Sequence, residues 1–127
     1  MPYCLTYVYV KISGSNFDLY DFCNKLNLDY SKIEPFYMEC ESIDLFRCEL
    51  FTGDINDSVR ETLAMLFGKE SVLSGLKEKY KLEYTLERVP IISNEDGYPY
   101  LRLSLDEDII EFMYKTGMRD DLDYHIH

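Results

Sequence analysis

Tryptophan is absent from this 127-residue chain, and glycine, proline, cysteine and histidine are sparse. With only 6 glycines and 4 prolines, no segment has the composition of a flexible or proline-rich linker, which predicts one domain over residues 1–127. The 4 cysteines form no C-x-x-C pair and have no histidine near them in sequence, which argues against a zinc site and a disulfide-rich scaffold. We therefore expect that folding requires no metal ion.

Basic residues are also in short supply. Lysine and arginine together number 13 against 24 aspartates and glutamates, so the formal net charge is −11. Nucleic acids and anionic membrane surfaces are bound by clustered lysine and arginine, and both are disfavoured as partners. The charge favours a basic protein partner, or it serves only to keep the protein soluble.

Long hydrophobic runs are missing as well. No stretch approaches the roughly 18 apolar residues that a membrane span requires. The opening stretch, MPYCLTYVYVKISG, lacks the basic region and long apolar run of a secretory signal. These features predict a cytoplasmic protein with reduced thiols.

The sequence lacks the usual combinations of catalytic residues. Both histidines, His125 and His127, lie in the last three residues, no phosphate-binding G-x-x-x-x-G-K sequence is present, and no local sequence supports a Ser–His or Cys–His pair. Asp121, Asp123 and His125 alternate on one face of the predicted last strand. They could converge on a metal, but a charged edge strand that prevents edge-to-edge pairing explains them better. We expect neither an enzyme nor a bound cofactor.

What is present follows two periodicities, the first typical of β-strands. Residues 3–12, YCLTYVYVKI, place Thr6, Val8, Val10 and Ile12 on one face and further apolar residues on the other. A strand that is apolar on both faces is typical of the centre of a sheet. Further strands are predicted at residues 43–51, 81–89, 101–105 and 122–126, the second of these with Leu82, Tyr84 and Leu86 on one face.

Apolar residues at helical spacing predict four helices, of which three lie in the first two thirds of the chain. The first helix follows Asp18, a favourable N-cap residue. The second covers about residues 57–67, and the third contains the stripe from Val72 to Tyr80. Residues 29–41, around a proline, are predicted to form a loop.

The fourth helix carries the clearest start signal. Ser104 and Glu107 form an S-x-x-E capping box, and Gly117 is placed to end the helix. The residues expected to face the core are Ile109, Phe112, Met113 and Thr116. Together the predicted elements indicate an α+β fold, a single-domain sandwich with a mostly antiparallel sheet and helices packed on one face.

Acidic residues form two candidate binding clusters. Helix capping explains the run from Asp106 to Asp108 without catalysis, because carboxylates stabilise the positive end of a helix. The first cluster of partner-binding candidates is Asp106, Glu107, Asp108, Glu111, Asp120, Asp121 and Asp123, all expected to be exposed. The second, in and beside the predicted loop, is Glu34, Glu39, Glu41 and Asp44. The aromatic residues expected beside these clusters are Tyr98 and Tyr100.

Three stretches together resemble the bacterial domain-of-unknown-function family 4279. They are VYVKISGSNFD at residues 8–18, the paired apolar helices near residues 57–80, and PYLRLSLDEDIIEFMYKTGMRDDLDYHI at residues 99–126. Residues 29–42 lack the tryptophan and the basic, glycine-containing loop of many members. The resemblance implies that this chain is an immunity partner of a polymorphic or contact-dependent toxin, and it carries over no catalytic residue.

Two function classes follow for the chain. The first is an immunity protein, or antitoxin, that binds and neutralises a cognate bacterial toxin domain, for example a nuclease, through an acidic surface. The alternative is a small-ligand-binding or regulatory module with a pocket between sheet and helices, which requires an apolar cavity of several hundred cubic ångströms.

Overall fold

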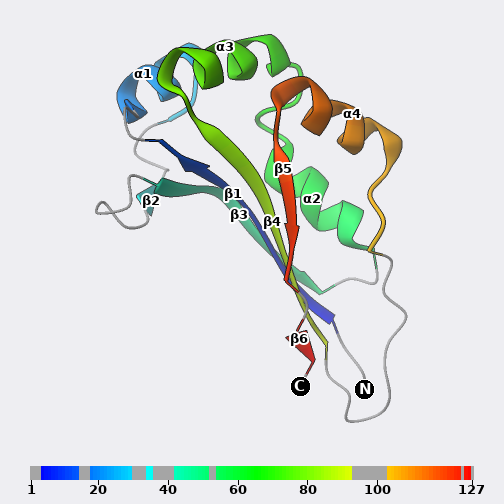
Figure 1. Cartoon of the computed structure of the whole chain (residues 1–127). Helices are drawn as coiled ribbons and strands as arrows, with labels where there is room; N and C mark the ends of the chain where they lie inside the picture. Colours follow the sequence, from blue (N-terminus) through cyan, green and yellow to red (C-terminus); the bar gives the residue numbers. More distant parts are fainter. Residues whose placement is uncertain are drawn as a thin grey trace.

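Four helices cover one face of a six-stranded sheet in the part of the chain that the structure describes (Figure 1). This computed structural model describes residues 4–14, 18–29, 34–35, 42–51, 54–92, 103–123 and 125–126. The strands are β1 (Cys4–Ser13), β2 (Glu34–Pro35), β3 (Ser42–Phe51), β4 (Glu83–Ile92), β5 (Arg119–Leu122) and β6 (His125–Ile126). The helices are α1 (Leu19–Leu26), α2 (Ile55–Leu63), α3 (Glu70–Tyr80) and α4 (Glu107–Thr116). The predicted α+β class is confirmed, although these residues form one small sheet and not two facing sheets.

β1 lies at the centre of the sheet, as its apolar pattern predicts. The strand order is β2-β3-β1-β4-β5, and β1 pairs antiparallel with both β3 and β4. β5 and β6 instead pair in parallel with β4. A parallel neighbour requires a crossover connection, and α4 lies in the connection between β4 and β5. The long pairings are thus antiparallel, and the C-terminal edge is parallel.

Strict alternation decides which side chains face the helices. Val8 and Val10 of β1 are fully buried, whereas Tyr7 and Tyr9, which alternate with them, are only half-buried. In β4 and the residue before it, the buried residues are Leu82, Tyr84, Leu86, Arg88 and Pro90. The inward face predicted for β4 is confirmed, and its buried series includes one arginine. β1, whose sequence is apolar on both faces, is fully buried on one of them and half-buried on the other.

Aspartate caps begin the first two helices. The side chain of Asp18 accepts a hydrogen bond of 3.1 Å from the backbone N–H of Asp21, as predicted. Asp54 accepts an equivalent bond of 3.0 Å from the backbone N–H of Asn56. Because of this second cap, α2 spans Ile55–Leu63 and is displaced toward the N-terminus from the predicted residues 57–67.

The start predicted for the fourth helix is wrong. The N-cap residue of α4 is Asp106, while Ser104 is exposed and lies outside the helix. The helix ends as predicted at Gly117, which has a φ of 68° that glycine adopts without strain. The predicted inward residues Ile109, Phe112, Met113 and Thr116 are all buried.

Three further predictions require correction. Residues 34–35 of the predicted loop form strand β2, in which Glu34 pairs with Asp44 of β3. Residues 103–105, the described part of a predicted strand, are not a strand, and residues 122–126 contribute to two short strands. Val72 of the third helical stripe is 39% exposed, so α3 is fixed through its buried residues Leu73 and Leu76.

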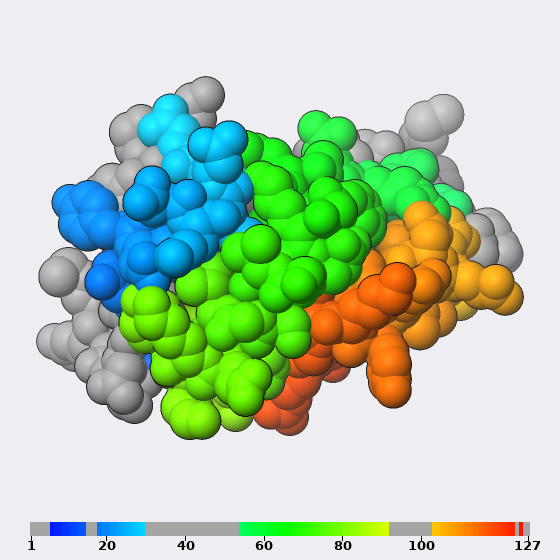
Figure 2. Space-filling view, turned by 90° about the horizontal axis from the view of Figure 1, so that it is seen from above, coloured from blue at the N-terminus to red at the C-terminus, as the bar shows by residue number. Residues whose placement is uncertain are grey.

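The helical layer is continuous across the sheet. Figure 2 looks onto this layer and shows α1, α3 and α4 side by side. α2 lies closer to the sheet and packs on β1 and β3. The hydroxyl of the fully buried Tyr84 donates a 2.7 Å hydrogen bond to the carbonyl of Leu73, which fixes β4 to α3, and burial raises the pKa of Tyr84. No helix among the described residues has the length and apolar character to cross a lipid bilayer.

Candidate functional site

Asn56, near the start of α2, holds the chain that leads into α4. This residue is only 2% exposed. Its side-chain amide donates to the carbonyl of Ser104 at 2.9 Å and to the carboxylate of Asp54 at 2.8 Å. Its side-chain oxygen accepts a 2.8 Å hydrogen bond from the backbone N–H of Asp106. The first turns of α2 and α4 are therefore held in a fixed relation.

Arg60 forms the second link between α2 and α4. Its Nη2 donates to the carboxylate of Asp106 at 2.8 Å and to that of Asp108 at 2.9 Å. A second bond from Nη1 makes the pair with Asp108 bidentate. The hydrogen bonds from Arg60 lower the pKa of Asp108, and the same bonds raise the pKa of Arg60. Both carboxylates are thus oriented by one guanidinium.

Each of the two linked helices exposes acidic residues. On α2, Asp57 and Glu61 are exposed one turn apart and so lie on the same side of the helix. On α4, Glu107 and Glu111 are exposed in the same way, and Glu111 pairs with Lys115 at 2.9 Å. We define the α2–α4 acidic surface as Asp57, Glu61, Asp106, Glu107, Asp108 and Glu111. Figure 2 shows the two helices adjoining at one end of the helical layer.

The predicted first cluster is therefore divided by the fold. Four of its residues, Asp106, Glu107, Asp108 and Glu111, belong to the α2–α4 acidic surface. The other three lie in or just after β5, at the edge of the sheet. There Asp121 is exposed, and Asp123 pairs with His125 at 3.1 Å.

Asp120 is exposed, as expected, but its carboxylate is held in an ion pair. It accepts hydrogen bonds of 2.7 and 2.6 Å from Nε and Nη2 of Arg88, which is 5% exposed. Nη1 of Arg88 donates to the carbonyl of Leu103 at 2.7 Å. Asp120 is consequently the partner of a buried cation, and reversing its charge would affect folding as well as the surface.

The remaining predicted residues lie elsewhere or outside the described part of the chain. Glu34 and Asp44 pair as strand residues of β2 and β3, at the sheet edge opposite β5. The candidates that lie outside the described residues are Glu39, Glu41, Tyr98 and Tyr100. Within the described residues, no group of three or more His, Cys, Asp or Glu side chains could hold a metal ion.

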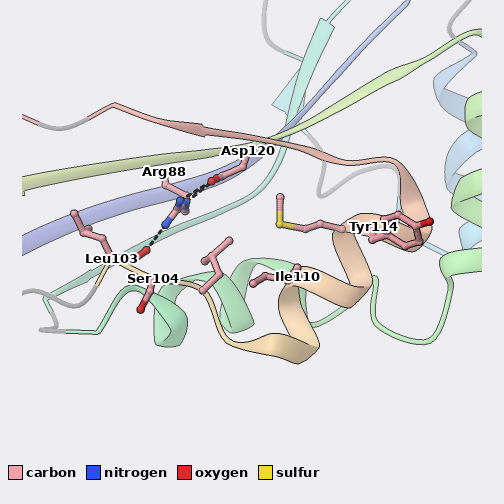
Figure 3. Close-up of a pocket in the computed structure, with 8 residues that line it drawn as sticks. Arg88, Leu103, Ser104, Ile110, Tyr114 and Asp120 are labelled. Atoms are coloured by element: carbon pink, nitrogen blue, oxygen red, sulfur yellow. Dashed lines mark hydrogen bonds and ion pairs between the residues drawn. The ribbon is translucent and has the colours of Figure 1, made fainter.

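A groove of about 460 Å³ lies between α4 and β5, and we call it the α4–β5 groove. Figure 3 shows Arg88 and Asp120 on its sheet side, with Ile110 and Tyr114 projecting from α4 on the other. Leu103 and the residues after it complete the lining. Ile110 is 53% exposed and Tyr114 is 87% exposed, so the groove is open to solvent along α4.

Four charged residues of this region escape prediction from sequence. Asp57 and Glu61 give a recognisable signal, because two acidic residues one turn apart on an amphipathic helix must face outward together. Arg88 gives another, because it continues the inward series of Leu82, Tyr84 and Leu86 in β4. The role of Arg60 depends on packing between α2 and α4, for which the sequence contains no local signal.

Comparisons with known proteins found no match to a protein-family model, to a curated protein or to a solved structure.

Proposed function

We propose that this chain is a cytoplasmic immunity protein that binds and neutralises a bacterial toxin domain with a basic surface. The observation that carries the proposal is the α2–α4 acidic surface, to which two helices contribute six carboxylates and on which Arg60 binds two of them, Asp106 and Asp108. The protein would act by binding through that surface, without a catalytic step and without a cofactor.

A nuclease is the toxin class that such a surface suits best. A nuclease cleft is basic because it binds phosphates, and carboxylates can occupy the same positions as phosphate mimics. Asn56 and Arg60 hold the two helices and the carboxylates of Asp106 and Asp108 in place before any partner arrives. Pre-organised groups lose less conformational entropy on binding, which favours a stable complex.

The alternative, a small-ligand or regulatory module, has weaker support. It requires a pocket that encloses most of its ligand. The α4–β5 groove has a suitable size, but Tyr114 on its rim is 87% exposed. Arg88, the cation that lines the groove, already donates to Asp120 and to Leu103. The geometry therefore favours a protein partner.

Co-production in bacteria tests the proposal directly. The genes beside that of this chain are sequenced, and a toxin domain that they encode is expressed with and without the chain. The expected result is growth arrest that the chain relieves, together with a complex of the two purified proteins. A neighbouring gene that encodes no toxin, or a toxin domain that the chain neither binds nor neutralises, would contradict the proposal.

Two matched variants assign the effect to the surface. Glu61→Lys with Glu107→Lys reverses two exposed charges of the α2–α4 acidic surface. Glu78→Lys with Glu83→Lys changes the net charge equally on exposed positions of α3 and β4. We expect the first variant to lose protection and the second to keep it. Equal losses would indicate that only net charge matters.

A further inference from the structure

The α4–β5 groove contains apolar side chains that the core does not use. α4 already buries Ile109, Phe112 and Met113. Ile110 and Tyr114 lie one turn apart on a different side of the helix, and both are more than half exposed. Exposed apolar side chains beside a groove mark a place where a partner can remove apolar area from water.

The charge around the groove selects among possible occupants. Residues 103–123 carry seven carboxylates against Lys115 and Arg119, and Arg88 adds one cation that Asp120 already binds. Glu107 does not line the groove, but it is exposed on α4 one turn before Ile110, which does. An occupant with lysine or arginine beside its apolar residue would match this field.

The position of β5 favours an extended occupant. In the strand order of the described residues, β5 is the last strand on its side of the sheet. This edge strand contributes Asp120 to one wall of the groove, and the helix α4 forms the other wall (Figure 3). An extended segment can lie along such an edge, with one side chain directed into the groove.

We propose that the α4–β5 groove binds an extended segment of the basic partner. One apolar side chain of the segment packs against Ile110, Met113 and Tyr114, and the flanking lysine or arginine side chains face Glu107 and Asp120. This inference rests on the proposed function and specifies which part of the partner the chain recognises. It assigns the α4–β5 groove as a second contact, which shares Glu107 with the α2–α4 acidic surface.

A synthetic peptide tests the groove without the toxin. The probe is a capped heptapeptide with one leucine between two pairs of lysines, and the comparison peptide has glycine in place of leucine. Titration into the full chain is followed by NMR of its methyl groups. We expect the leucine peptide to shift the methyl signals of Leu105, Ile110 and Met113, and to bind at least about fivefold more tightly than the glycine peptide.

Ile110→Asp is the critical variant, because it places a charge at the centre of the apolar contact. Val72→Asp is its matched control, since Val72 is also an exposed β-branched residue on a helix and does not line the groove. We expect Ile110→Asp to weaken peptide binding about tenfold or more, and Val72→Asp to leave it unchanged. Equal affinity for the two peptides, equal effects of the two variants, or shifts confined to residues outside the groove would overturn the inference.

The test of the α4–β5 groove and the test of the proposed function can fail independently of each other. Ile110→Asp is also introduced into the toxin co-production experiment. If protection persists with Ile110→Asp and the peptide does not bind, the groove is not a contact and the immunity function stands. If the peptide binds in the groove but the chain neutralises no toxin, the groove is a recognition site for basic segments and the immunity function is wrong.

Discussion

Asp120 of β5 binds the guanidinium of Arg88 of β4 through two hydrogen bonds, across the parallel edge of the sheet. Arg88 is almost fully buried, and its third bond reaches the carbonyl of Leu103 just before α4. One buried cation thus connects β4, β5 and the approach to α4. Because an isolated buried charge is strongly unfavourable, Asp120 is required for folding to a degree that an exposed carboxylate is not.

This relation predicts different effects for two neighbouring aspartates. Asp120→Asn should lower the free energy of unfolding by about 2–3 kcal/mol, somewhat less than for a fully buried pair because Asp120 is partly exposed. Asp121→Asn, on the adjacent exposed residue, should change it by about 0.5 kcal/mol or less. Urea unfolding of both variants measures the difference. Equal stabilities would show that Arg88 does not depend on Asp120.

The link through Asn56 gives a second prediction. Asn56→Ala removes the partners of the Ser104 carbonyl and the Asp106 N–H, and unsatisfied groups of this kind destabilise by about 1–3 kcal/mol. Glu61→Ala, on the exposed side of the same helix, serves as control and should change stability by about 0.5 kcal/mol or less. Thermal unfolding of the two proteins provides the comparison, and similar midpoints would mean that Asn56 does not hold α4.

The corrected start of α4 gives a third prediction. Because Ser104 lies outside the helix and is exposed, Ser104→Ala should change the free energy of unfolding by about 0.5 kcal/mol or less. Phe112→Ala should lower it by about 3–5 kcal/mol, since it removes a buried aromatic ring that packs edge-on against Phe67. Chemical denaturation distinguishes the two outcomes. A loss of about 1 kcal/mol with Ser104→Ala would indicate that Ser104 does cap the helix, as the sequence predicts.

The pair of Arg60 and Asp108 predicts a dependence on pH. Arg60 holds the pKa of Asp108 below its usual value of 3.8 in the folded protein. The stabilisation that results is complete above that value and is lost as the pH falls through the lower, folded pKa. Arg60→Met removes the guanidinium that causes this stabilisation and leaves an apolar side chain of similar length in its place.

The measurement is the difference in unfolding free energy between the native protein and Arg60→Met, taken at about pH 6 and at about pH 2. At the higher pH the native protein should be more stable than Arg60→Met. At the lower pH the difference in stability between the two proteins should be smaller. A difference that is the same at both pH values would show that Arg60 stabilises the fold by packing alone.

Local patterns were sufficient to predict most individual elements. Alternation identified the buried face of β4, and helical spacing identified the inward residues of α4. These predictions succeed because a strand or helix side is determined by neighbours only two to four residues away. The central place of β1 was predicted from the apolar residues on both of its faces, although among the described residues the helices cover one of these faces.

Relations between distant residues could not be predicted in this way. Residues 103–105 alternate like a strand, but the carbonyls of Leu103 and Ser104 accept from Arg88 and Asn56 instead of a neighbouring strand. Asp120 resembles an exposed edge residue until its partner, 32 residues away, is known to be buried. Four of the six residues of the α2–α4 acidic surface were predicted, whereas Asp57 and Glu61 were not, because the place of α2 relative to α4 depends on the links through Asn56 and Arg60.

Steered association with a basic toxin domain is the remaining prediction. Exposed carboxylates raise the rate of encounter with a cationic partner, and salt screens the effect. Glu61→Lys with Glu107→Lys should slow association about tenfold at low salt and flatten its dependence on salt concentration. Both side chains are exposed, so the folded state should persist, and circular dichroism verifies this.

Glu78→Lys with Glu83→Lys has the same net charge and should slow association much less, because those residues lie away from the α2–α4 acidic surface. Stopped-flow measurements over a range of salt concentrations give both rates. If the two variants associate at the same rate, the field of the whole molecule governs encounter, and the α2–α4 acidic surface does not face the partner.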